Sequence, residues 1–152
     1  MESPIMMLDE RTDQATRKML QKVVERKQKF DKLEFQHLCI MWSTILVSFG
    51  YFLYLYLTIF KPYSYSFATV FSVYINNFIH LIMLMVVIGL FGLMNVYRQK
   101  RDKAEKEFHL LRCEIIDKSK DLWRKEEEWK NRHIVFEMMK KNFDINLFHE
   151  NK

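Results

Sequence analysis

The sequence has few of the residues that end helices or cross-link chains. Its 152 residues include only two prolines, three glycines and two cysteines. No proline lies between Asp9 and Phe60, and neither glycine nor proline follows Gly92. Because glycine and proline are the main breakers of regular structure, their scarcity predicts long helices. The two cysteines, Cys39 and Cys113, are expected as reduced thiols and indicate no disulfide framework.

Charge is absent from two long apolar runs. Residues 38–60 and residues 74–97 contain no Asp, Glu, Lys or Arg. A helix of about 20 apolar residues crosses the hydrocarbon layer of a bilayer, and each run exceeds that length. The sequence therefore predicts an all-α membrane protein, in which these two runs form a two-span transmembrane helical hairpin.

The charged residues gather in the two ends of the chain. Residues 1–36 hold eight basic and seven acidic residues, and residues 98–152 hold 15 and 12. The segment between the spans has one charged residue, Lys61. Since basic residues near membrane spans favour the cytoplasmic side, we expect a multi-pass protein of the cell membrane with both termini in the cytoplasm.

The connection between the spans, residues 61–73, is expected outside the cell as a loop or an interfacial helix. Five apolar side chains around it follow helical spacing: Phe67, Val70, Phe71, Tyr74 and Phe78. Serine, threonine and asparagine side chains lie largely elsewhere around the same helical wheel, which is typical of an amphipathic helix. The alternative is that the second span begins earlier and tilts in the bilayer.

Both ends are predicted to form long cytosolic helices. Residues 1–37 read as an amphipathic helix with a partial apolar stripe. Residues 98–152 read as a charged helix supported by favourable pairs four residues apart, such as Glu114 and Lys118. Large apolar residues recur there every seven positions: Phe108, Ile115, Leu122, Trp129 and Phe136, with Phe143 one further repeat away.

This seven-residue stripe is the predicted interaction surface. A repeat of seven can mark a coiled coil, but basic residues interrupt the complementary seam position at Lys118, Lys125 and Arg132. Three contacts therefore stay open for the stripe. They are another copy of the chain in a coiled coil, the N-terminal helix of the same chain, and the lipid headgroups.

Candidate chemical sites are sparse. His109 and Cys113 are four residues apart, with Glu105 one turn earlier, a spacing that can direct side chains to one metal ion. A structural zinc site takes four ligands, and the sequence offers no second cluster. We therefore expect surface or packing roles for these residues, and neither a metal nor a cofactor.

His80 is the one histidine within the predicted spans. An ionisable residue inside a membrane raises the hypothesis of a functional role. Because it lies close to the outer end of its span, we expect His80 to reach water and form interfacial hydrogen bonds. No nucleotide-binding or catalytic motif accompanies it, and the interleaved charges of the tail disfavour nucleic-acid binding.

Several strings of residues outside the spans are distinctive. They are DERTDQATRKML at residues 9–20, DKAEKEF at 102–108, LRCEII at 111–116 and DLW at 121–123. These strings resemble the YpbF-like family, small two-span membrane proteins of Bacillus and its relatives. The resemblance covers most of the chain up to Trp123. It implies a Gram-positive plasma membrane and assigns no site residues.

The expected function is that of a non-enzymatic interaction or accessory protein in the lipid bilayer. Its cytosolic helices would bind another copy or another membrane protein, and no small-molecule substrate is evident. The alternative is a subunit of a small oligomeric transporter or channel. Two spans enclose no pore, so that alternative requires an oligomer with a polar stripe. The spans offer only scattered polar residues, which disfavours it.

Overall fold

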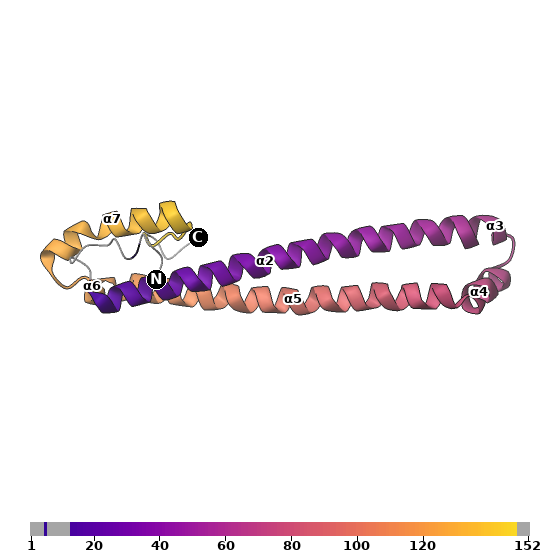
Figure 1. Ribbon diagram of the computed structural model, residues 1–152, viewed down its shortest axis with the longest axis horizontal. Coiled ribbons are helices and arrows are strands. Elements are labelled where there is room, and N and C mark those ends of the chain that lie inside the picture. The colour runs from indigo at the N-terminus through magenta and orange to yellow at the C-terminus, as the bar shows by residue number, and fades with distance from the viewer. Residues whose placement is uncertain (1–4, 6–12, 149–152) are drawn as a thin grey trace. The chain divides into compact units, whose positions relative to one another are not determined.

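The fold is helical throughout the part of the chain that the structure describes. The structure is a computed structural model and describes Ile5 and residues 13–148 (Figure 1). In chain order the elements are α2 (Gln14–Leu55), the π-helix η1 (Tyr56–Phe60), α3 (Lys61–Tyr63), α4 (Phe67–Asn76), α5 (Phe78–Asp117), α6 (Ser119–Leu122) and α7 (Glu126–Phe143). The prediction of an all-α fold is confirmed.

The chain divides into two compact units. Unit 1 combines Met1–Leu33 with Arg101–Lys152, and unit 2 is Glu34–Lys100. Within the described residues, two helices are long and apolar enough to cross a membrane, Gln14–Tyr63 with 50 residues and Phe78–Asp117 with 40. The two long apolar helices expected from the sequence are therefore present.

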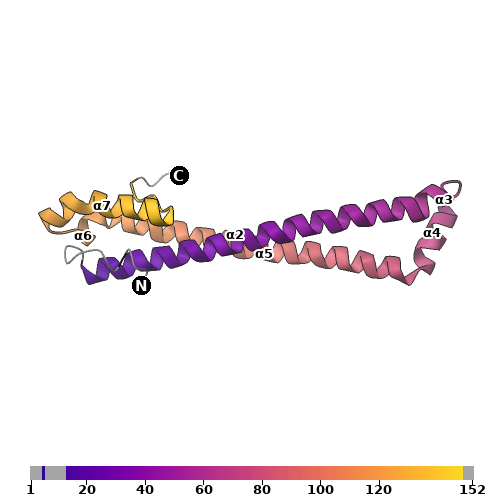
Figure 2. The same cartoon turned by 45° about the horizontal axis from the view of Figure 1, so that its top comes forward.

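Unit 2 is a helical hairpin closed by a short helix. The second half of α2 and the first half of α5 lie side by side and run in opposite directions, with α4 at their joined end (Figures 1 and 2). The core of this end comprises three buried residues, Tyr51, Leu55 and Ile59. Side chains from α4 and α5 pack against them, namely Val70, Val73, Tyr74 and Val87. This core positions α4 on the hairpin.

The π-helix η1 lies directly before Pro62. Proline has no N–H group, and its ring clashes with the carbonyl four residues earlier in a regular α-helix. The backbone here widens, so that the N–H of Lys61 donates to the carbonyl of Tyr56, five residues before it. The helix thereby continues past Phe60 into α3 before the chain turns at Ser64.

The second long helix begins later than the sequence predicted. We expected the second span to start at Tyr74, but Tyr74 belongs to α4 and α5 starts at Phe78. Asn77 has an extended backbone (φ −102°, ψ 103°), and its Oδ1 accepts the N–H of Ile79 at 3.1 Å. An asparagine at this position caps a helix N-terminus, so Asn77 separates the two helices. The short helix that the spacing predicted is α4.

Unit 1 differs from the single tail helix that we expected over residues 98–152. Helix α5 ends at Asp117, and α6 and α7 follow after breaks. Because the chain reverses here, α7 lies alongside α2 and α5 (Figures 1 and 2), and Trp123 becomes buried at the turn with 2% exposure. The apolar area buried by this reversal compensates for the interrupted helical hydrogen bonds.

One hydrogen bond and one backbone conformation support the reversal. The hydroxyl of Thr16 in α2 donates to the carbonyl of Leu122 at 3.1 Å, which satisfies one of the free carbonyls at the end of α6. At the other end of α7, Asp144 adopts the left-handed conformation (φ 56°), which aspartate tolerates better than most residues. The chain then turns so that Ile145 and Leu147 are buried in the core.

Candidate functional site

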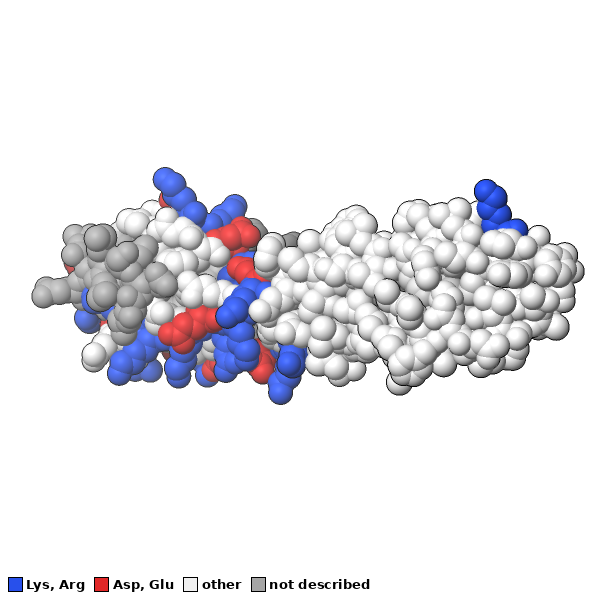
Figure 3. All heavy atoms as spheres, turned by 45° about the vertical axis from the view of Figure 1, so that its right-hand side comes forward, with Lys and Arg blue, Asp and Glu red and all other residues white. Residues whose placement is uncertain are grey.

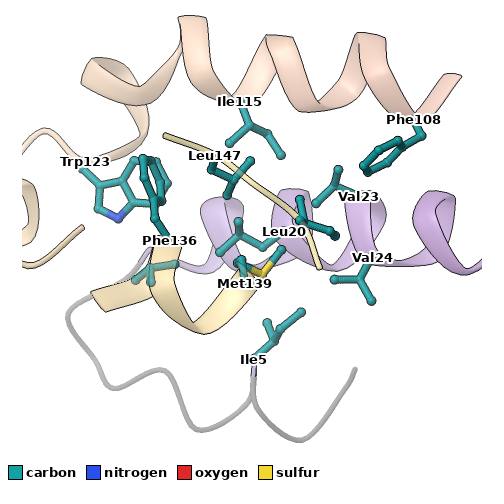
Figure 4. Packing of buried hydrophobic residues seen from close by; sticks show 12 residues of the cluster. Ile5, Leu20, Val23, Val24, Phe108, Ile115, Trp123, Phe136, Met139 and Leu147 are labelled. Atoms are coloured by element: carbon teal, nitrogen blue, oxygen red, sulfur yellow. The ribbon is translucent and has the colours of Figure 1, made fainter. Parts of the chain in front are cut away.

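The five residues of the predicted interaction surface come together in unit 1, but they point inward. Phe108 and Ile115 on α5 and Phe136 on α7 are buried, and Leu122 and Trp129 are partly buried against the same cluster. Figure 4 shows side chains from α2 meeting those of α5 and α7 in this core. The α2 residues of this core are Leu20, Val23 and Val24, and the other labelled residues include Ile5, Trp123, Met139 and Leu147.

The stripe therefore packs against the N-terminal helix of its own chain, one of the three contacts that the sequence left open. Phe136 lies between two further aromatic rings, those of Trp123 at 5.5 Å and Phe148 at 5.4 Å, both edge to face. Such pairs add stability beyond the buried area. A contact between these five residues and another molecule stays a prediction. Because the five residues are buried or partly buried, the rest of the unit 1 surface is more accessible to a partner.

Charged residues join α2 to α5 at the surface of unit 1. Arg26 donates to the carboxylate of Glu107, and Lys29 lies 3.8 Å from the same carboxylate. Next to them the rings of Phe30 and Phe108 are stacked, with centroids 6.5 Å apart. These contacts fix the two helices of the unit against each other close to the surface.

The most exposed large aliphatic side chain among the described residues of unit 1 lies beside these ion pairs. Leu110 on α5 is 72% exposed and borders two surface grooves. The larger groove, of about 780 Å³, lies between α2 and α5 and is lined by Lys22, Glu25, Arg26, Lys29, Glu107, Leu110, Leu111 and Glu114. The smaller, of about 560 Å³, is lined by Asp102, Glu105, Lys106, His109, Leu110 and Cys113. Leu110 thus forms an apolar ridge between two charged depressions.

One lysine on this helix has an altered titration. The Nζ of Lys118 lies 2.6 Å from Oε1 of Glu114, and this hydrogen bond raises the pKa of Lys118 above its ordinary value. The side chains of Lys118 and Glu114 are 55% and 43% exposed. Exposed pairs of this kind contribute little to stability, so we assign this pair to the surface of the helix and not to a reactive site.

The residues with metal-ligand spacing form a partial cluster. His109 Nε2 lies 3.8 Å from Oε1 of Glu105, and Cys113 borders the same groove. Across residues 13–148 and Ile5, no group of three or more His, Cys, Asp or Glu side chains is arranged to hold a metal ion. Cys113 is a partly exposed thiol and Cys39 an exposed one.

Unit 2 contains an aromatic cluster around His80. The imidazole is stacked on the ring of Tyr74 from α4, at 5.6 Å and 9°, and lies against the ring of Tyr54 from α2 at 5.5 Å. Tyr51 donates to the backbone carbonyl of His80 at 3.2 Å. The hydroxyls of Tyr51 and Tyr74 are 3.0 Å apart. This cluster connects all three helices of the hairpin.

The expectation that His80 reaches water is wrong in this structure. The residue is only 2% exposed, because the rings of Tyr54 and Tyr74 cover it. Its Nδ1 has no hydrogen-bond partner among the described residues. The packing of α4 covers His80 in the first turn of α5, while Phe78 and Ile79 beside it are exposed; a search for membrane spans in the sequence does not reveal this burial.

Known proteins with similar sequences assign the chain to a family. A family described as "protein of unknown function (DUF2663)" matches residues 19–150. The chain belongs to the DUF2663 family. It is also 36% identical, over the 152 residues that make up both chains, to the "Uncharacterized protein YpbF" of Bacillus subtilis (strain 168). No solved structure matches the chain.

These matches confirm the resemblance to the YpbF-like family and extend it. The sequence strings that carried the resemblance stopped at Trp123, whereas the DUF2663 match continues to residue 150. Helix α7 therefore lies within the part that family members share. Neither description names an activity or a ligand.

Three features of this DUF2663 member were not predicted from its sequence. Thr16 and Trp123 were not assigned roles, although DLW at 121–123 was one of the distinctive strings. The contact between Tyr51 and Tyr74 joins residues 23 positions apart and exists only after the hairpin closes. Five tyrosines lie within residues 51–65 and were a visible signal for this end of the hairpin, but such crowding fits anchoring at a membrane interface equally well.

Proposed function

We propose that this protein is an integral membrane protein of the cell membrane that acts without catalysis, through association of its cytosolic unit 1. In this proposal unit 2 is the membrane-spanning hairpin, and both chain termini lie in the cytoplasm. The observation that carries the proposal is the exposed apolar surface of unit 2. In the most apolar 18-residue windows of its two long helices, only 11% and 6% of the residues are buried.

The exposed side chains of unit 2 are those expected in contact with lipid. Large apolar residues such as Leu46, Phe52 and Met85 are more than half exposed. Exposed apolar surface of this extent is unfavourable in water and favourable in the hydrocarbon layer. Figure 3 shows Lys, Arg, Asp and Glu gathered over unit 1, whereas unit 2 is almost entirely without them on this face.

Hydroxyl groups in the hairpin also suit an apolar solvent. Thr44 and Thr58 donate to the carbonyls of Ile40 and Tyr54, one turn earlier, at 2.7 Å each. Polar groups without water must find partners within the protein, and these bonds satisfy both hydroxyls. The basic residues flanking the hairpin, including Lys32 and Arg98, support a cytoplasmic location for unit 1.

Association is assigned to the ridge at Leu110, and the partner is a second copy of the chain. The larger groove beside Leu110 carries three basic and three acidic side chains. In a two-fold interface the same patch meets itself, so its charges must be self-complementary. A charge-balanced groove next to an exposed leucine meets this requirement. In this proposal the buried stripe stabilises the fold of unit 1 and does not contact the partner.

Cysteine crosslinking in native membranes tests this proposal. Cys39 and Cys113 are replaced by serine, and one new cysteine is placed at Lys106, one turn from Leu110 and exposed, or at Lys140 on α7 as the control. We expect two differently tagged copies to crosslink through position 106 and not through 140. Leu110→Glu should abolish that product, while Ile134→Glu, at another exposed aliphatic residue of unit 1, should retain it.

Two results would contradict the proposal. Equal crosslinking at positions 106 and 140 would indicate random collision in the membrane. A product at 106 that survives Leu110→Glu would show that the copies meet through a different surface.

A further inference from the structure

We propose that α4 lies flat in the outer interface of the membrane and inserts a row of apolar side chains among the fatty acyl chains of the outer leaflet. The row consists of Phe67, Phe71 and Ile75 on α4 and Phe78 at the start of α5. We call it the apolar row. This inference rests on the proposed membrane location of unit 2.

The apolar row is unusually exposed for residues of its kind. Phe67 is 85% exposed and Phe71 57%, and Ile75 and Phe78 are exposed as well. The three α4 members are four residues apart, so they lie along one face of the helix. The rings of Phe67 and Phe71 are stacked with centroids 6.4 Å apart, and they form a continuous apolar surface.

The other two faces of α4 show that the helix is held in place, so the exposure of the apolar row does not come from a loosely packed helix. One face, formed by Val70, Val73 and Tyr74, packs against the buried core of the hairpin end, and the hydroxyl of Tyr74 contacts that of Tyr51. A third face presents the exposed side chains of Ser72 and Asn76. The helix is thus fixed in one rotation, with separate faces for protein, apolar solvent and water.

The direction of α4 suits a membrane interface. Within unit 2, α4 runs across the end of the hairpin and not along α2 and α5 (Figures 1 and 2). If the long helices follow the membrane normal, α4 lies near the membrane plane. Helices in that position bury an apolar face at the level of the headgroups and upper acyl chains and keep a polar face in water.

Continuity with the span surface identifies lipid as the occupant of this face. Phe78 ends the apolar row and begins α5, whose next residues include the exposed Ile79 and Ile82. No Asp, Glu, Lys or Arg occurs from Pro62 to Tyr97. A water-soluble partner would be expected to meet a polar rim, whereas the apolar row merges with the surface assigned to lipid.

Nitroxide labelling in liposomes tests the inference. Single cysteines are placed at Phe71 and Ile75 in the apolar row, and at Ser72 and Asn76 on the polar face as matched neighbours, with Cys39 and Cys113 replaced by serine. Met85→Cys, at an exposed position in the apolar first half of α5, reports insertion of the hairpin. Accessibility of each label is measured with oxygen, which concentrates in lipid, and with a water-soluble nickel chelate.

We expect the labels at 71, 75 and 85 to favour oxygen and those at 72 and 76 to favour the nickel chelate. If all four α4 labels favour nickel while position 85 favours oxygen, α4 stands off the membrane and the inference is wrong, although the hairpin spans it. If 71 and 75 are hidden from both reagents, a protein surface covers the row and lipid is not the occupant. A label at 85 that favours nickel would overturn the membrane location itself.

Discussion

Unit 1 and unit 2 are built on the same two helices, yet they distribute polarity in opposite ways. In unit 1 the apolar side chains of α2, α5 and α7 meet in a common core, and the charged residues form surface ion pairs such as that of Arg26 with Glu107. In unit 2 large apolar side chains point outward, whereas Thr44 and His80 are buried. In the proposed membrane location, each of the two long helices would pass from water into lipid along its length.

The two units therefore depend on different stabilising contacts. In water, burial of apolar area is the main favourable term, so unit 1 needs the fold-back of α7 to complete a core. In lipid, apolar side chains gain little by leaving the solvent, and packing and hydrogen bonds between helices carry more weight. The Tyr51, Tyr74 and His80 contacts at the hairpin end are of that kind.

The largest expected effect comes from removing a ring from the core of unit 1. Phe136→Ala deletes a buried side chain packed between Trp123 and Phe148, and such deletions cost about 3–5 kcal/mol. We expect a loss of this size in the free energy of unfolding of unit 1. It is measured on the full chain by the fluorescence of Trp123 and Trp129, with Trp42 replaced by Phe.

Ile134→Ala is the matched control for this experiment. Ile134 lies two residues away on α7, and its side chain is 54% exposed. Surface substitutions usually change stability by less than about 0.5 kcal/mol. Equal losses for the two variants would mean that α7 does not pack as the structure shows.

A charge within the exposed face of unit 2 should have the next largest effect. Val47→Arg and Leu84→Arg each place a charge on an exposed apolar face, which costs about 2.5–3.5 kcal/mol at the centre of a membrane helix. We expect reduced membrane insertion of both variants, measured by fractionation. Asn142→Arg, at an exposed position of unit 1, should insert normally. Normal insertion of Val47→Arg or Leu84→Arg would contradict the proposal that the exposed face of unit 2 contacts lipid.

Removal of one hydroxyl from the hairpin end should have a smaller effect. Tyr51→Phe keeps the ring but deletes the donor to the carbonyl of His80 and the contact with Tyr74. Hydrogen bonds between membrane helices average about 0.6 kcal/mol, so we expect a loss of about 1 kcal/mol in detergent-unfolding experiments. Tyr56→Phe, at an exposed tyrosine, is the control and should be neutral. An equal loss in both would show that the Tyr51 hydroxyl makes no special contact.

The smallest expected effect concerns the surface pair of Glu114 and Lys118. The hydrogen bond to Glu114 raises the pKa of Lys118, so the pair stabilises the folded state at every pH below the ordinary lysine pKa of about 10.4. This contribution is present at neutral pH and disappears as the pH rises through the raised value, so it gives stability no pH dependence near neutrality. Glu114→Gln should lower the pKa of Lys118 toward the ordinary value in an NMR titration, and an unchanged value would contradict the contact.

The helical content of the fold was predictable from the sequence because its signals are local. The scarcity of glycine and proline and the two uncharged runs each report on neighbouring residues, and α2 and α5 follow them closely. The spacing of Phe67, Phe71 and Tyr74 likewise predicted the helix that the structure shows as α4. The cap at Asn77 was missed because Asn76 and Asn77 fit an interfacial segment as well as a helix boundary.

The reversal after α5 was not predictable by the same means. The seven-residue repeat continues unbroken from Ile115 through Leu122 to Trp129, and no glycine or proline marks the turn. The break accompanies the packing of α7 against α2, which is distant in the chain, within one buried core. The seven-residue spacing marked the stripe as one apolar set, and the structure gathers its members in one cluster, but local spacing could not decide what they contact.

Cysteine accessibility in intact cells tests most directly the central claim, that unit 2 spans the membrane and unit 1 lies in the cytoplasm. Single cysteines at Ser64, Met85 and Lys120, all exposed in the structure, replace Cys39 and Cys113 as the only thiols. The account predicts that an impermeant reagent labels position 64 in intact cells, labels position 120 only after permeabilisation, and labels position 85 in neither case. Labelling of position 120 with protection of 64 would invert the topology, and labelling of position 85 in intact cells would contradict the membrane-spanning hairpin.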